Sequence, residues 1–341
     1  MTNTGDKINN SSHGYTAVAF ALVGNGFIAV LKLIGFFISG SSALFSEAVH
    51  SFADTLNQAL LMIGIKKSTK LPDKEFSYGY GRERFVWALI SACGVFFIGA
   101  GITVYHGINS LLHREEIEIG PIVFIILAIS FLVESFTFFV ALRELKRANR
   151  KMKLIEALKH GDPTTAAILY EDGVAVLGVI IAFISTILSS LTNNFLWDGI
   201  GSIIIGVLLG VVAIILINKN REYLIVKSVP ESVKKKIIKI FEADPSIEKV
   251  IDFKSAILDI GRFRVKCEVE FNGTGLLKEI YKDDFLKEEY ELVKKDYGEF
   301  AKFCAEYIDR VPRLMGKKID EIEKTIQKQI PEIKHIDIEI N

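Results

Sequence analysis

The chain has 341 residues, half of them hydrophobic, and it carries no formal net charge. This hydrophobic content is high for a soluble protein of its length, and the lack of net charge argues against a nucleic-acid partner. The three cysteines, Cys93, Cys267 and Cys304, are too scattered for a disulfide framework or a CxxC metal site.

Residues 1–14, MTNTGDKINNSSHG, form a polar N-terminal tail. The tail lacks the apolar run and small-residue cleavage site of a signal peptide, and it lacks the arginine content of a transit peptide. We therefore expect a multi-pass protein of the plasma (inner) membrane rather than of an organelle.

Six apolar stretches follow the tail. A helix that crosses a bilayer needs about 20 residues, and the six stretches of that length lie near 15–38, 43–65, 86–109, 120–142, 164–188 and 196–217. The sequence thus predicts an α-helical membrane protein whose transmembrane domain, residues 15–220, has six helices.

Lysine and arginine are concentrated in two of the connecting loops, 66–84 and 143–159. The loops 107–119 and 189–196 hold a single arginine between them, Arg114. By the positive-inside rule, the two basic loops and both termini lie on the cytoplasmic side.

Residues 221–341 are charged and predict a cytoplasmic domain. PESVKKKIIKIFEADPSIEK has the period of an amphipathic helix. KVIDFKSAILDIG and RFRVKCEVEFNG alternate like two strands of a hairpin that turns at Gly261. A helical stretch over 274–315, a second amphipathic helix and the strand KHIDIEI follow, an order that predicts a small α+β sandwich with a helical insertion. Cys267 and His335 fall on predicted strands, where we expect a packed thiol and a surface histidine.

A polar stripe interrupts the second apolar stretch. In FSEAVHSFADTLNQ, the residues Glu47, His50, Asp54, Asn57 and Gln58 recur at helical spacing and so share one face. In a bilayer such a stripe must face the bundle interior or a water-filled cavity. His50 and Asp54 are one turn apart, so their side chains can converge on one ion.

The fifth stretch carries a second polar insertion, Glu171 and Asp172. Counted from the basic residues, Asp54 and Asp172 both lie roughly 18–20 Å from the same side of the membrane. An imidazole with two or three carboxylates suits Zn²⁺, and it also fits Mn²⁺, Fe²⁺ or Co²⁺. Protons compete with the metal for such ligands, which is the physical basis of proton-for-metal exchange. The alternative is a His–Asp pair that only holds helices together.

Other polar residues lie within the apolar stretches. Glu134 is a proton carrier, a charge that attracts cations, or a helix-packing group, and Glu47 and Asn57 are further candidates for a proton or cation pathway. Lys32 is expected to extend toward the outer interface; alternatively it pairs with Glu47, which would remove Glu47 from the metal pathway. Asp198 is expected to be a helix cap.

These motifs resemble the cation diffusion facilitator family from about Tyr15 to Asn341. SGSSALFSEAVHSFADTLNQALL is similar to the family's second span, SYGYGRERFVWALI to the segment before its third, and DGIGSIIIG to its sixth. DPTTAAILYEDGVAVLG, the ILDIGRFRVKCEVEFNG hairpin and the long helical insert before HIDIEI most resemble the branch of the mitochondrial zinc exporter.

The resemblance implies a homodimeric zinc-for-proton antiporter with a cytoplasmic ferredoxin-like domain, which exports metal from the cytoplasm and uses no other cofactor. His50 and Asp54 match the family's HxxxD on the second span, and Asp172 matches the aspartate of the fifth. Ile168 stands where that span's histidine is expected, so Glu171 is the substitute ligand. The implied metal ligands are His50, Asp54, Asp172 and Glu171.

Three other functions stay open. A transporter of Mn²⁺, Fe²⁺ or Co²⁺ would use the same mechanism. A cation channel would need weaker binding, because tight binding slows ion release. An intramembrane metalloenzyme would need an open coordination position and a general base; since no HExxH or GxSxG motif occurs, we do not expect an enzyme.

Overall fold

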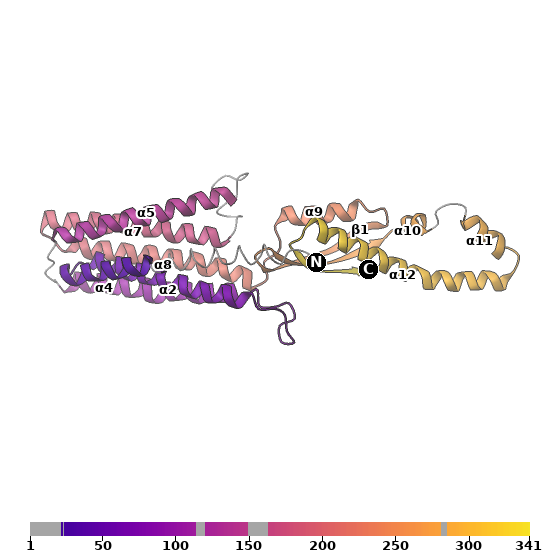
Figure 1. The fold of residues 1–341 in the computed structure, drawn as a ribbon, viewed down its shortest axis with the longest axis horizontal. Helices are drawn as coiled ribbons and strands as arrows, with labels where there is room; N and C mark the ends of the chain where they lie inside the picture. The colour runs from indigo at the N-terminus through magenta and orange to yellow at the C-terminus, as the bar shows by residue number, and fades with distance from the viewer. Residues whose placement is uncertain (1–21, 23, 114–119, 149–162, 281–284) are drawn as a thin grey trace. The chain divides into compact units, whose positions relative to one another are not determined.

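A computed structural model describes residues 22, 24–113, 120–148, 163–280 and 285–341. The chain divides into two compact units, Met1–Leu224 and Ile225–Asn341. We call them the helical unit and the sheet unit (Figure 1).

The helical unit consists of long helices, and each predicted apolar stretch falls within one of them as far as it is described. A first helix covers Gly24–Ser39. The third stretch is one continuous helix in three segments, α3 (Glu83–Gly94), the π-helical turn η1 (Val95–Ala100) and α4 (Gly101–Leu112). The remaining helices are α2 (Ser42–Ser68), α5 (Pro121–Ala148), α7 (Pro163–Thr192) and α8 (Leu196–Leu224).

Among the described residues, four helices are long and apolar enough to cross a membrane. Those four are Glu83–Leu112, Pro121–Arg147, Ile168–Thr192 and Leu196–Leu224. The helix α2 has 27 residues, which is about 40 Å of helix, but its polar stripe lowers its hydropathy. Gly24–Ser39 is apolar but shorter, and the rest of the first predicted stretch lies outside the described residues.

Asp198 is a cap, although of a neighbouring helix. It lies in the first turn of α8, and its carboxylate accepts hydrogen bonds from the Ser41 hydroxyl (2.7 Å) and the Ala43 amide (3.2 Å) at the start of α2. Ser41 in turn accepts the Leu44 amide hydrogen bond. A carboxylate at a helix N-terminus satisfies free amides and complements the helix dipole, so Asp198 fixes where α2 begins.

The core of the helical unit lies between α2, α5, α7 and α8. Leu44, Leu127, Val179 and Ile205 are buried together there. The helix α7 packs against α2, α5 and α8, which brings the middle of α7 to the polar stripe of α2.

The sheet unit contains a three-stranded sheet in the order β1-β2-β3. The strands β1 (Ile247–Asp259) and β2 (Arg262–Phe271) form an antiparallel hairpin, and β3 (Ile333–Ile340) pairs in parallel with β2. Gly261, in the turn, has a φ of 67°, a conformation that glycine adopts without strain. The predicted hairpin and its turn are therefore confirmed.

The helices of the sheet unit are α9 (Glu231–Glu242), α10 (Gly273–Ile280), α11 (Phe285–Val293) and α12 (Tyr297–Gln329). The helix α9 packs against β1, and α12 packs against β3 and α9 (Figure 1). The shared core includes Phe241, Val265, Cys267, Ile326 and Ile333.

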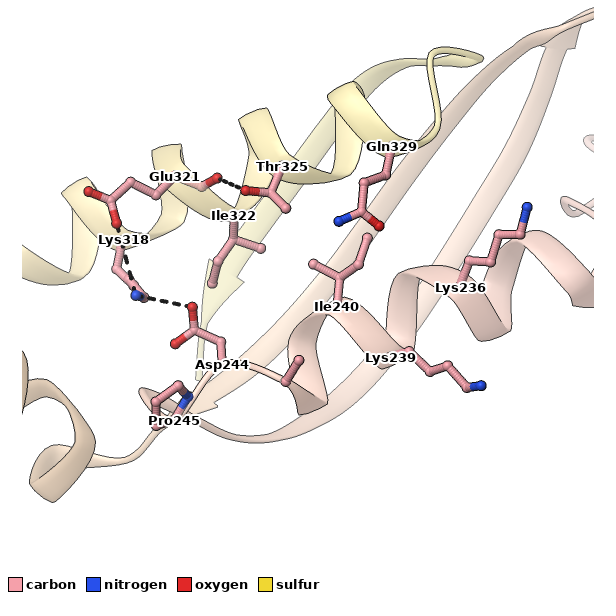
Figure 2. A pocket seen from close by; sticks show the side chains of 11 residues that line it. Lys236, Lys239, Ile240, Asp244, Pro245, Lys318, Glu321, Ile322, Thr325 and Gln329 are labelled. Carbon is pink, nitrogen blue, oxygen red and sulfur yellow. Dashed lines mark hydrogen bonds and ion pairs between the residues drawn. The ribbon is translucent and has the colours of Figure 1, made fainter.

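An open groove of about 540 Å³ runs between α9 and α12. Figure 2 shows Lys318 of α12 reaching toward Asp244 at the end of α9, with 3.1 Å between the ammonium nitrogen and the carboxylate. Asp244 also accepts hydrogen bonds from the Ser246 amide and hydroxyl. The groove thus contains an ion pair that ties the two helices together.

Cys267 and His335 are not paired with each other in the sheet. Cys267 is buried in the sheet core, and burial raises the pKa of its thiol to about 12. His335 lies opposite Arg264 in the strand register, whereas Ile338 lies opposite Cys267. The expected packed thiol is confirmed.

Candidate metal-binding site

His50 and Asp54 lie together on the polar face of α2. The Nε2 atom of His50 is 3.3 Å from Oδ2 of Asp54, as their one-turn spacing predicts. His50 is buried, and neither ring nitrogen has a hydrogen-bond partner among the described residues. A buried polar nitrogen without a partner is costly, and a neutral imidazole nitrogen is a good metal ligand. The pair is therefore half of the candidate cation site.

Glu171 of α7 is held by α2. The side-chain amide of Asn57 donates to both carboxylate oxygens of Glu171 at 2.8 Å. Ser91 of α3 donates to the Asn57 carbonyl oxygen at 2.6 Å. This chain of hydrogen bonds joins three helices, and it occupies the oxygens that Glu171 would offer to a metal.

The acids of α2, α5 and α7 are electrostatic neighbours. Asp54 interacts with Glu134 and Asp172, Glu171 with Asp54 and Asp172, and Asp172 with Glu134. Residues from three helices, far apart in sequence, therefore share one region, as their matched depth predicted for Asp54 and Asp172. Ile168, which stands where the fifth-span histidine is expected, is 41% exposed, and its side chain has no atom that could bind a metal.

The four predicted ligands are near one another without forming a closed coordination sphere. Within the described ranges, no three His, Cys, Asp or Glu side chains are placed to hold a metal ion together. His50 and Asp54 are in contact, whereas Glu171 is turned to Asn57. Binding by all four residues thus requires side-chain rearrangement, beginning with release of Glu171.

Lys32 does not extend to an interface. It is fully buried, and its ammonium group contacts Glu47 Oε2 (2.8 Å), Ser51 Oγ (2.8 Å) and Glu134 Oε1 (3.5 Å). The expected orientation toward the outer interface is wrong, and the alternative, a pair with Glu47, is found. We call these four residues the Lys32 cluster; it joins the first helix to α2 and α5.

Glu47 lies directly against a glycine of α7. A Cβ atom added to Gly178 would lie 2.4 Å from Glu47 Oε1. That oxygen is buried, and it has no hydrogen-bond partner in the described part of the chain. Gly178, Ser51 and Ser91 carry no distinguishing signal in the sequence, because small residues occur throughout these helices and only packing distinguishes them.

A search for related sequences yields a consistent group. Residues 18–225 match the family model for the cation efflux transmembrane domain. The chain is 38% identical over 330 residues to the human proton-coupled zinc antiporter SLC30A9, mitochondrial, which covers 95% of this chain and 58% of that protein. It is 36% identical over 338 residues to metal tolerance protein C4 of Arabidopsis thaliana, and the match covers 97% of this chain and 74% of that protein.

A third relative, the SLC30A9 protein of Xenopus laevis, is 36% identical over 329 residues, which is 95% of this chain and 59% of the relative. The chain thus spans less than two thirds of the SLC30A9 proteins. Because these relatives are named mitochondrial, the expected plasma-membrane location is wrong. That expectation depended on the composition of residues 1–14, which does not determine the membrane that a helical bundle occupies.

Proposed function

Because this chain belongs to the cation diffusion facilitator family, we propose that it is a divalent metal cation/proton antiporter, with Zn²⁺ as its principal cargo. The observation that carries the proposal is His50, a buried imidazole whose nitrogens make no hydrogen bond in the described residues and whose Nε2 faces Asp54 at 3.3 Å, near the acids of α7. Relatives named proton-coupled zinc antiporters support zinc as the cargo. Family members move metal ions and are not enzymes.

We assign His50, Asp54, Asp172 and Glu171 as the metal ligands. Glu171 must first exchange its two hydrogen bonds from Asn57 for the cation. The carboxylates bind metal only when ionised and His50 only when neutral, so each cation that enters displaces protons. Asn57 completes the polar path that the cation follows, whereas Glu47 and Glu134, which pair with Lys32, are assigned to the path of the protons.

The proposed architecture has six spans, with the first helix and α2 joining the four apolar helices. The α2 helix is long enough, and its polar residues face the bundle. The sheet unit, with its two packed helices and three strands, corresponds to the ferredoxin-like domain of a homodimer. The relatives' names favour a mitochondrial membrane. In this proposal the protein moves the cation across the membrane, away from the side on which the basic loops 66–84 and 143–159 lie.

A second cargo class follows from the ligands themselves. Three carboxylates and one imidazole form a harder set than a site with two histidines, and harder ligands favour Mn²⁺ and Fe²⁺ relative to Zn²⁺. Transport of Mn²⁺, Fe²⁺ or Co²⁺ by the same mechanism is therefore the alternative. A channel would not couple cation flow to protons.

The test is metal uptake by proteoliposomes that contain the full chain under an imposed pH gradient. Zn²⁺, Mn²⁺, Fe²⁺ and Co²⁺ are compared in parallel, for the natural chain and for Asp54→Asn and Asp172→Asn. We expect proton-coupled uptake by the natural chain and a loss of at least about 100-fold in both variants, since each removes a charged ligand. Asp252→Asn, on an exposed strand of the sheet unit, is the matched control. Normal transport by Asp54→Asn would refute this site.

A further inference from the structure

Lys32 is a buried cation placed between two buried acids. Its ammonium group lies 2.8 Å from Glu47 and 3.5 Å from Glu134, and it also donates a hydrogen bond to Ser51 Oγ. Lys32 and Glu47 are both inaccessible to solvent. Charges are retained at such depth only when they are paired, and a buried lysine in a membrane bundle is by default functional.

The Lys32 cluster adjoins the proposed metal ligands. Glu47 is one helical turn before His50, and both Glu47 and Glu134 interact electrostatically with Asp54. Glu47 Oε1 points to no donor within the described residues. Without Lys32, two more carboxylates would therefore be free beside a site that already contains three.

Extra carboxylates would oppose transport. A carrier must bind its cargo tightly enough to capture it and weakly enough to release it. Five uncompensated carboxylates around one divalent ion would favour capture over release. Lys32 prevents this because it occupies Glu47 and Glu134 with a cation that is covalently attached and cannot leave.

We propose that Lys32 is a tethered counter-cation that withholds Glu47 and Glu134 from the transported metal and so keeps its binding reversible. Lys32 is a positioning residue, since it acts through the two glutamates and does not contact the metal. The inference rests on the proposed function and assigns a role to a group outside the ligand set.

The test measures Zn²⁺ affinity by calorimetric titration of the full chain in detergent, and Zn²⁺ transport in proteoliposomes. Lys32→Met keeps an unbranched side chain, one atom shorter, and removes its charge. We expect the dissociation constant and the KM for Zn²⁺ to fall roughly tenfold, the scale on which residues around metal ligands alter affinity. The maximal transport rate should fall in parallel, because release becomes slow.

Two compound variants separate this role from a structural one. Lys32→Met/Glu134→Gln leaves only Glu47 unpaired, so it should still bind Zn²⁺ more tightly than the natural chain. Lys32→Met/Glu47→Gln/Glu134→Gln contains no free carboxylate in the cluster, so its affinity should return to the natural value. A purely structural Lys32 predicts no tightening in any of the three variants.

Each other outcome contradicts the proposal. An unchanged or weaker Zn²⁺ affinity in both Lys32→Met and Lys32→Met/Glu134→Gln would overturn it. So would failure of these two variants to fold while the triple variant binds normally, because Lys32 would then only stabilise the bundle. If the natural chain itself neither binds nor transports a divalent metal, the proposed function fails first, and the two failures are thereby distinguished.

Discussion

The helical unit and the sheet unit place their charges in opposite ways. In the helical unit, Lys32 pairs with Glu47 where no solvent reaches either group. In the sheet unit, ion pairs lie along solvent-accessible strands, among them Lys249–Glu270, Arg264–Asp337 and Lys266–Glu339. The sheet unit instead fills its interior with apolar groups such as Phe241 and Ile326.

This difference indicates where the chemistry of the protein is located. Exposed ion pairs contribute little to stability and are compatible with many sequences, whereas buried charges are costly and persist where a function needs them. The sheet unit thus has the character of a stable module held by its core. The helical unit gives up stability to keep acids and an imidazole inside the bundle.

The largest effect should come from breaking a pair in the helical unit. Glu47→Ala leaves the Lys32 ammonium buried with a weaker set of partners, and it should destabilise the helical unit by about 4 kcal/mol. Asp337→Ala removes an exposed partner of Arg264 and should change stability by less than about 1 kcal/mol. Thermal unfolding of both variants in detergent measures the difference, and equal midpoints would remove the contrast between the two units.

The position of the polar stripe was predictable because polar residues in an apolar stretch are conspicuous and helical spacing assigns them a face. Asp54 and Asp172 were placed at one depth by counting residues from basic loops, and in the structure they are near enough to interact electrostatically. The strands of the sheet unit were predictable for a similar reason, because alternation and the turn at Gly261 are local features.

The contacts between side chains on different helices were less predictable from the sequence. Whether Lys32 reaches an interface or Glu47 depends on how the first helix is rotated against α2 and α5. The bond from Asn57 to Glu171 depends on how α2 faces α7, and Asp198 caps α2 only because α8 begins beside it. None of these rotations is encoded in a local pattern, so residue types alone left the alternatives open.

A change in the core of the sheet unit should be nearly as large but confined to that unit. Ile326 is fully buried, and Ile326→Ala should destabilise the sheet unit by about 3 kcal/mol through lost contacts and a cavity. Hydrogen exchange of the full chain should show faster exchange in β1, β2 and β3, with α2 and α7 unchanged. Loss of protection in α2 as well would mean that the two units do not unfold independently.

Gly178→Ala tests the close approach of α7 to the Lys32 cluster. The added Cβ would lie 2.4 Å from Glu47 Oε1, so the carboxylate must move, which perturbs the contact of its other oxygen with Lys32. We expect a destabilisation of about 2 kcal/mol, typical of overpacking, together with slower Zn²⁺ transport. Gly94→Ala is the matched control, because no atom lies within 4 Å of its added Cβ; a methyl group there should be neutral or slightly stabilising. Equal effects of the two substitutions would show that Glu47 has room to move.

The smallest effect concerns pH and the groove between α9 and α12. Burial raises the pKa of Asp244, but hydrogen bonds from Ser246 and the Lys318 ammonium outweigh it and lower the pKa below its usual value. Asp244 is therefore ionised more easily in the folded chain than in the unfolded chain. Its contribution is complete above the unfolded pKa of about 3.9 and is lost as the pH falls through the lower folded value. We expect Asp244→Asn to lower the stability of the sheet unit by about 1 kcal/mol or less at pH 7 and to have less effect near pH 3. Thermal unfolding of both chains over this pH range measures it; a difference that grows on acidification would show that the ion pair does not stabilise the sheet unit.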